Sequence, residues 1–156
     1  MRSNRVRHAE IRGLEPDRTA APSRLALYLS LAYTLAIVYA SLTPFTGWRD
    51  PGTDPFDFIG APWPRFVTRF DILINVLAYL PFGFLVTISL LGRLRTLPAA
   101  VLAALMSALL SCLLEVLQAY LPARIPSNID FAANTVGGVV GAVLAARAGA
   151  DRKSHV

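Results

Sequence analysis

The chain has 156 residues, of which 54% are hydrophobic and 16% are charged. Globular domains carry about 25% charged residues, and a mean hydropathy of +0.50 is high for this length. These values exclude a soluble monomer with an ordinary charged surface, and they argue against a disordered chain, a disulfide scaffold and a nucleic-acid-binding protein. The net charge of +5 does not by itself indicate nucleic-acid binding. The single cysteine, Cys112, cannot form an internal disulfide.

Four apolar segments predict an all-α membrane protein, built as a bundle of four transmembrane helices. Each segment is about 18–25 residues long, which is enough to cross a hydrocarbon core of about 30 Å as a helix that satisfies its own backbone. The predicted helices are 25–42, 71–91, 97–121 and 129–146. They form one transmembrane domain, 25–146, between a basic and disordered N-terminal tail, 1–24, and a C-terminal tail, 147–156.

The placement of arginine and lysine predicts that both termini are cytoplasmic. The two tails and the turn between the second and third segments hold 11 basic residues, whereas the other two loops hold 4. Basic residues are enriched on the cytoplasmic side of membrane proteins. Residues 44–70 and 122–128 should therefore face outward.

Two segments allow a second interpretation. The basic start, the first apolar segment and then Val38-Tyr39-Ala40 resemble a cleavable signal peptide. We favour an uncleaved helix, because the basic region is long for that role and Pro44 follows closely.

The loop 43–70 is rich in proline and aromatic residues, which suit the headgroup region. This composition favours a loop lying on the membrane over a lid above a site.

Seven polar side chains are predicted to meet at one depth, near the outward ends of three helices. Ionisable residues inside a membrane are costly, so each one is a functional candidate. Spacings of three or four residues place the members of each pair on one helix face. The seven are Asp71 and Asn75, Glu115 and Gln118, Asp130 and Asn134, and Arg124 in the turn before the last helix.

Each of these residues also has a plain structural interpretation. Asp71 and Asp130 stand at helix starts, where acids are ordinary, and the amides could bond neighbouring helices. Glu115 is different, because it lies among apolar residues about two turns inside its helix and needs a partner. We therefore predict one polar cluster in which Arg124 bridges the carboxylates of Glu115 and Asp130, with Asp71 and Asn75 at its edge.

Proline and small residues are expected to shape two of the helices. Pro81 should kink the second helix, and Gly83 allows close packing beside the kink. Gly137, Gly138 and Gly141 contribute to faces of small residues on the fourth helix, which should pack closely on another helix. A helix of the same bundle is the favoured partner, and self-association through this face is the alternative.

The candidate residues do not match the usual catalytic or zinc sites. Both histidines lie in the tails, so no Ser–His or Cys–His pair forms at the polar layer, and zinc lacks its usual nitrogen and sulfur ligands. The oxygen-rich set could hold a divalent cation such as Mg²⁺, or could perform acid–base hydrolysis with paired carboxylates. Neither is indicated over the other. No cofactor is expected, and the sequence leaves open whether the protein is an enzyme.

A series of short motifs follows in order along the chain. It consists of Asp71-Ile-Leu-Ile-Asn75, Pro81-Phe82-Gly83-Phe84, Glu115-Val-Leu-Gln118, Arg124, Asp130-Phe-Ala-Ala-Asn134 and Gly137-Gly138. Over roughly residues 41–146 this series resembles the VanZ-like family of bacterial membrane proteins, named after a protein linked to low-level teicoplanin resistance. The resemblance implies a multi-pass protein of the bacterial plasma membrane with a role in the cell envelope or in glycopeptide resistance. It implies no particular reaction.

Three functions are compatible with these patterns. The first is a non-enzymatic envelope protein whose outer-leaflet polar site binds a lipid headgroup, an envelope precursor or a glycopeptide-like ligand. The second is an intramembrane enzyme that acts on a lipid-linked envelope precursor, with Glu115 and an aspartate as acid and base. The third, a small transporter or flippase subunit, is disfavoured because the inner halves of the helices hold few polar residues, such as Thr87, Ser89 and Ser107.

The predicted orientation can be tested by labelling with an impermeant thiol reagent in intact cells. Cysteines placed at Thr53 and Ser127 should react, because both positions are expected outside. A cysteine at Thr96 should stay unlabelled. Labelling at Thr96 without labelling at Thr53 would reverse the orientation.

Overall fold

The computed structural model describes residues 23–64 and 66–154, and these residues form an all-helical bundle. Four of its helices are long and apolar enough to cross a membrane. The prediction of a four-helix membrane protein is therefore confirmed. The prediction of a disordered tail falls on residues 1–24, of which 1–22 lie outside the described residues. The helices are α2 (Arg24–Leu42), α3 (Asp57–Gly60), α4 (Arg69–Leu90), α5 (Thr96–Ala119) and α6 (Asn128–Ser154).

The last helix departs most from its predicted bounds. The four long helices begin one or two residues before their predicted starts, but α6 continues to Ser154 rather than ending at residue 146. Much of the expected C-terminal tail is thus helical. The stretch beyond residue 146 contains alanines and basic residues, which are good helix formers, and no proline.

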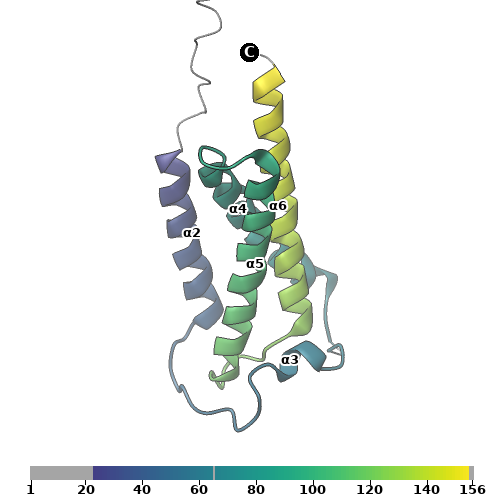
Figure 1. Ribbon diagram of the computed structural model, residues 1–156. Coiled ribbons are helices and arrows are strands. Elements are labelled where there is room, and N and C mark those ends of the chain that lie inside the picture. Colours follow the sequence, from purple (N-terminus) through teal and green to yellow (C-terminus); the bar gives the residue numbers. More distant parts are fainter. Residues whose placement is uncertain (1–22, 65, 155–156) are drawn as a thin grey trace, which may run out of the picture.

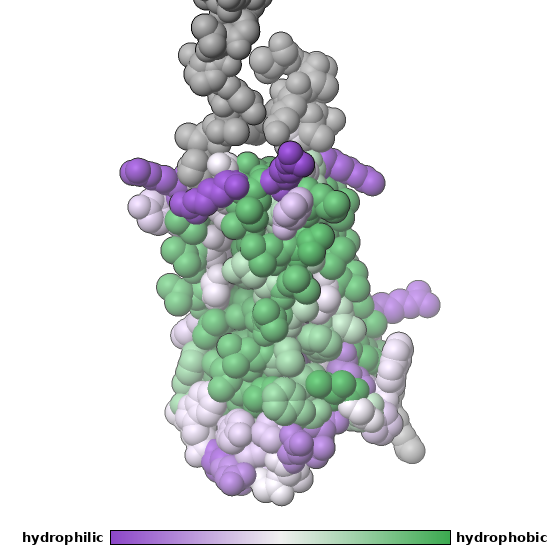
Figure 2. Space-filling view, in the orientation of Figure 1, coloured by the Kyte–Doolittle hydropathy of each residue, from purple (hydrophilic) through white to green (hydrophobic). Residues whose placement is uncertain are grey.

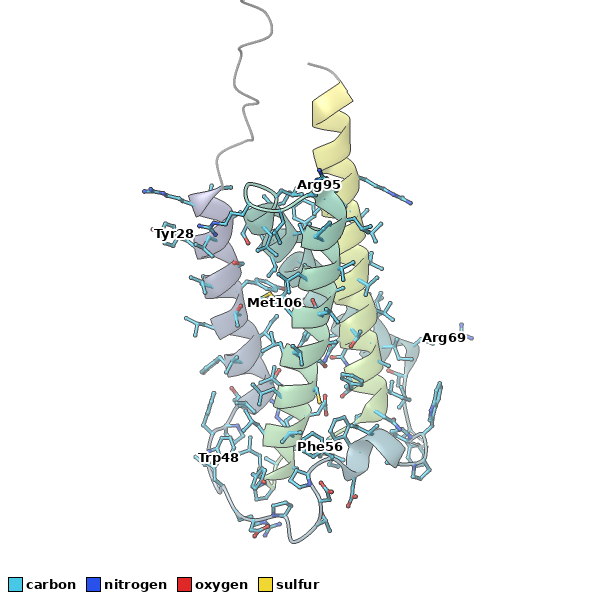
Figure 3. All side chains as sticks on the ribbon, in the orientation of Figure 1. Tyr28, Trp48, Phe56, Arg69, Arg95 and Met106 are labelled. Atoms are coloured by element: carbon cyan, nitrogen blue, oxygen red, sulfur yellow. The ribbon has the colours of Figure 1, made fainter. Side chains whose placement is uncertain are left out.

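The long helices alternate in direction and leave an apolar belt between two polar ends. In Figure 1 the start of α2, the α4–α5 turn and the end of α6 lie at one end of the bundle, and α3 lies at the other. Figure 2 shows a hydrophobic belt with hydrophilic residues gathered at both ends. Figure 3 places Tyr28 and Arg95 near one end and Trp48 and Phe56 near the other, which is the usual distribution of interfacial residues.

Large apolar side chains cover the outside of the bundle. Leu35, Leu97 and Leu109 are 70%, 74% and 69% exposed. A water-soluble bundle would bury such residues, whereas lipid is as apolar as the leucine side chain itself. The exposed leucines therefore favour a hydrocarbon environment for this belt.

The closest packing in the bundle joins α4 to α6 through glycines. A β-carbon added to Gly83 would collide with the carbonyl of Gly138, and one added to Gly141 would collide with the carbonyl of Leu80. A β-carbon on Gly137 would likewise meet the carbonyl of Val76. The small-residue face of α6 therefore packs within the bundle, as the favoured interpretation of the sequence expected.

The long loop between α2 and α4 is tied to the end of the bundle on the α6 side. Phe58 of α3 is buried and meets Phe131 edge to face, with ring centroids 6.3 Å apart. The Asn128 side chain donates to the carbonyl of Ala61 at 2.6 Å, and the Arg49 backbone N–H donates to the carbonyl of Tyr120 at 3.0 Å. These contacts anchor the loop against the start of α6 and the end of α5.

Substitution of Gly138 tests the tight helix contact. A β-carbon at this position would overlap the side chain of Ser107 on α5. Gly138→Leu should lower the free energy of unfolding by about 1–3 kcal/mol, as overpacking does elsewhere, and the thermal melting of detergent-solubilised protein would measure it. Val139→Leu is the matched control, because Val139 faces outward on the same helix and is 42% exposed. Equal melting of both variants and the wild type would show that the contact is not tight.

Candidate functional site

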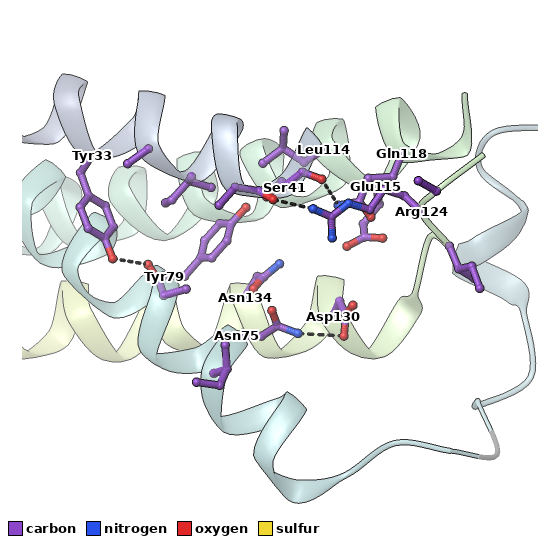
Figure 4. Close-up of a pocket in the computed structure, with 17 residues that line it drawn as sticks. Tyr33, Ser41, Asn75, Tyr79, Leu114, Glu115, Gln118, Arg124, Asp130 and Asn134 are labelled. Carbon is purple, nitrogen blue, oxygen red and sulfur yellow. Dashed lines mark hydrogen bonds between the residues drawn. The ribbon is translucent and has the colours of Figure 1, made fainter. Parts of the chain in front are cut away.

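A cavity of about 710 Å³ lies toward the end of the bundle that carries the long loop, and we call it the polar cavity. It is lined by α2, α4, α5, the start of α6 and the turn between α5 and α6 (Figure 4). Six of the seven predicted polar residues line it. They are Asn75, Glu115, Gln118, Arg124, Asp130 and Asn134.

Glu115 is hydrogen-bonded at the start of α6. Its side chain is 2% exposed, and its carboxylate accepts a hydrogen bond of 2.7 Å from the backbone N–H of Ser127. The Ser127 hydroxyl accepts in turn from the backbone N–H of Asp130 at 3.3 Å, so Ser127 acts as the N-cap of α6. In a capping box, the N–H of the capping residue is bonded by an acid three residues further along the same helix. Here Glu115 reaches across from α5 to take that place.

This arrangement leaves Asp130 free to turn toward α4. Its carboxylate accepts a hydrogen bond of 2.8 Å from the side-chain amide of Asn75 (Figure 4). The pair joins the first turn of α6 to α4 across the edge of the polar cavity. Glu115 and Asp130 thus both line the cavity, but each is held by a different neighbour.

Arg124 caps the end of α2 instead of bridging carboxylates. Its Nε donates to the carbonyl of Thr43 at 3.0 Å, and its Nη2 donates to the carbonyl of Ala40 at 2.7 Å. Gln118 donates to the neighbouring carbonyl of Ser41 at 3.1 Å. The last carbonyls of a helix lack partners within the helix and carry negative partial charge, so a guanidinium suits them well.

The predicted bridge by Arg124 is therefore wrong. No hydrogen bond joins its guanidinium to Glu115 or Asp130 in the part of the chain that the structure describes. The backbone acceptors at the end of α2 satisfy the guanidinium. The N-terminus of α6 satisfies Glu115.

Asp71 does not line the polar cavity. It is exposed and forms a capping box with Thr68, whose hydroxyl accepts from the Asp71 backbone N–H at 3.1 Å. In return the Asp71 carboxylate accepts from the Thr68 backbone N–H at 2.9 Å. The ordinary role of an acid at a helix start explains this residue, and its placement at the edge of the cluster is not supported by these contacts.

Two tyrosines that sequence reasoning missed also line the cavity. Tyr33 of α2 donates a hydrogen bond of 3.0 Å to the carbonyl of Ala78, close to Pro81 in α4. Tyr79 is 3% exposed, and its hydroxyl has no hydrogen-bond partner among the described residues. Tyr79 follows Asn75 by four residues on one helix face, so this spacing was a signal that could have found it.

A buried polar contact beside the cavity joins α6 to α5. The side-chain amide of Asn134 donates to the hydroxyl of Ser111 at 3.0 Å, and both residues are buried. The Asn134 Oδ1 atom has no hydrogen-bond partner among the described residues. A buried acceptor without a donor is costly, so this atom marks a place where the cavity is incomplete without a ligand or water.

The polar cavity presents carboxylate, amide and hydroxyl groups. Within residues 23–64 and 66–154, no group of three or more histidine, cysteine or acidic side chains could hold a metal ion.

The long loop does not contribute to the polar cavity, because no described residue from 44 to 70 lines the cavity. The loop is therefore not a lid over this cavity in the structure.

The contact between Glu115 and α6 predicts a specific pattern of stabilities. Glu115→Leu removes the acceptor for the Ser127 N–H and should lower the free energy of unfolding by about 1–2 kcal/mol, the usual cost of losing an N-cap acceptor. Glu115→Gln keeps an acceptor oxygen and should lose clearly less. Leu113→Ala, at a 55% exposed position on the same helix, is the control expected to stay near wild type. Equal losses for the Gln and Leu variants in thermal melting would contradict the capping role.

Comparison with known proteins agrees with the sequence motifs. No curated protein and no solved structure matches the chain. The sequence model of the VanZ/LLP1 family matches residues 21–149, which include all four membrane-spanning segments and every residue of the polar cavity. The chain therefore belongs to the VanZ/LLP1 family.

Proposed function

We propose that the polar cavity binds the headgroup of an amphipathic cell-envelope molecule, and that the protein acts in the envelope without catalysing a reaction. In this proposal both termini are cytoplasmic and the cavity opens toward the outer leaflet of the bacterial plasma membrane. The positive-inside count supports the orientation. The single observation that carries the binding proposal is the unpartnered Asn134 Oδ1 in the wall of a cavity inside a membrane-spanning bundle.

The walls of the cavity suit a molecule that is polar at one end and apolar elsewhere. Ile37, Ile74 and Leu114 line it beside the carboxylates and amides, and Ile74 is 48% exposed on the outside of α4. Ile125 also lines it and is 86% exposed. An amphipathic ligand could place its headgroup among the polar side chains while its chain stays against exposed apolar surface.

The other half of the bundle does not favour a transport path. The hydroxyls of Thr87, Ser89 and Ser107 each donate to a carbonyl of their own helix, three or four residues earlier. Side chains that bond their own backbone leave no polar surface for a substrate to follow. This observation supports a site at one membrane face rather than a channel through the bundle.

The headgroup proposal predicts that filling the cavity abolishes binding. Ala36 is an exposed residue of α2 that lines the cavity, whereas Leu35 beside it is 70% exposed and does not line it. Native mass spectrometry of protein purified in mild detergent should show co-purified envelope lipid on the wild type and on Leu35→Trp. The same lipid should be missing from Ala36→Trp, because the indole occupies the space of the headgroup. Equal lipid on both tryptophan variants would refute a ligand in this cavity.

A cellular measurement extends the same pair of variants to the envelope role. The wild type and Leu35→Trp should change the teicoplanin susceptibility of a sensitive bacterium, and Ala36→Trp should not, at equal expression.

Incubation of the purified protein with a labelled lipid-linked precursor separates binding from catalysis. Turnover that Glu115→Gln abolishes would replace the binding function with the enzymatic alternative.

A further inference from the structure

Two hydrogen-bond acceptors in the wall of the polar cavity have no donor among the described residues. Asn134 is 8% exposed, and its Oδ1 has no hydrogen-bond partner among the described residues. The hydrogen bond from Asn75 reaches only Oδ1 of Asp130, and no described donor bonds its Oδ2. Figure 4 shows Asn134 and Asp130 on neighbouring turns of α6, and both residues line the cavity.

Asp130 is also the charge in the cavity with the weakest compensation. Glu115 bonds the backbone N–H that caps α6, where the helix dipole favours an anion. Arg124 donates to two carbonyls at the end of α2, where the dipole favours a cation. Asp130 has only the neutral amide of Asn75 as its hydrogen-bond partner. It lies at the N-terminus of α6, where Glu115 already bonds the backbone. When both carboxyl groups are ionised, two carboxylates face one guanidinium, and the cavity carries an excess of negative charge.

We propose that the polar cavity recognises a primary ammonium group on its amphipathic ligand. This inference rests on the proposed headgroup function and names its chemical class. An ammonium group has three N–H donors and no acceptor. It can therefore bond both the carboxylate of Asp130 and the Asn134 Oδ1, which lie four residues apart on α6, while its charge balances Asp130.

Other headgroups fit these atoms less well. A phosphate or carboxylate brings only acceptors when ionised, and it would face the acceptors of Asp130 and Asn134. A glycerol or unsubstituted sugar could donate to them but would leave the Asp130 charge unbalanced. Taking a charge out of water is costly unless it is both paired and hydrogen-bonded, and Asp130 is half-buried, so the ammonium satisfies both requirements at once.

The test compares matched probes that differ only at the amine. Short-chain phosphatidylethanolamine and its N-acetylated derivative form one pair, and an alkyl glucosaminide with its N-acetyl counterpart forms the other. Each probe is titrated into the full chain in detergent micelles. The amine of at least one pair should bind about tenfold more tightly than its acetylated partner, which is the scale of one charge-assisted hydrogen bond. The pair that shows the preference identifies whether the ammonium belongs to a phospholipid or to an amino sugar.

Variants connect the preference to the named residues. Asp130→Asn removes the charge and should abolish the preference for the amine, whereas Asp57→Asn, at an exposed acid of the loop, should keep it. Asn134→Ala removes the unpartnered acceptor and gives a second measurement if Asp130→Asn does not fold. Folding of each variant is checked by near-ultraviolet circular dichroism.

Three outcomes would overturn the ammonium proposal, and they differ in what else they affect. If both members of each pair bind equally and Ala36→Trp abolishes the binding, the cavity still binds headgroups but does not select an amine. If Ala36→Trp changes no binding at all, the proposed headgroup function is lost together with the ammonium. Tighter binding of a short-chain phosphatidylglycerol than of either amine would likewise contradict the charge argument.

Discussion

The hydrogen bond from the Ser127 N–H to the Glu115 carboxylate holds together the end of the bundle at which the polar cavity lies. It joins α5 to the start of α6 across a short turn, and it satisfies a buried acid with the positive end of a helix. Because the acid that caps α6 comes from another helix, Asp130 need not bond its own N-cap and can face α4 instead. The position of Asp130 in the cavity follows from that exchange.

A charged side chain from another segment also caps the end of α2, but there it is a cation bonded to carbonyls. Arg124 and Gln118 bring donors from the α5–α6 region to the last carbonyls of α2. The last carbonyls of a helix have no partners within that helix, and donors from α5 and the following turn bond them here. The polar residues of the cavity therefore fasten four helices together, α2, α4, α5 and α6, and their remaining polar atoms line the cavity.

The sequence predicted the spans well, because length and hydropathy determine which segments cross a bilayer. It also predicted the close packing of Gly137, Gly138 and Gly141, since small residues at helical spacing allow backbones to approach. The partner of Arg124 could not be predicted in this way. Its acceptors are backbone carbonyls, which every residue carries, so no side chain in the sequence marks them.

The structure differs from the sequence prediction at two further residues, and each difference has a physical reason. Asp71 follows Thr68 by three residues at a helix start, which is the spacing of a capping box. In the structure Asp71 bonds Thr68 and does not join Asn75 at the cavity. Tyr79 was overlooked because a tyrosine in an apolar helix is ordinarily a packing or interfacial residue. Only the structure shows that its hydroxyl is buried without a partner in the wall of a cavity.

The length of α6 makes its two ends electrically unequal. Its 27 residues extend about 40 Å, more than the hydrocarbon core of about 30 Å, so its C-terminal turns reach beyond the apolar belt. Water and salt screen the partial negative charge at that end. The opposite end is embedded among protein groups near Glu115, where a lower dielectric strengthens each charge. The start of α6 thus acts at the cavity as a positive pole, while the negative pole at its other end lies beyond the apolar belt, too far away to weaken it.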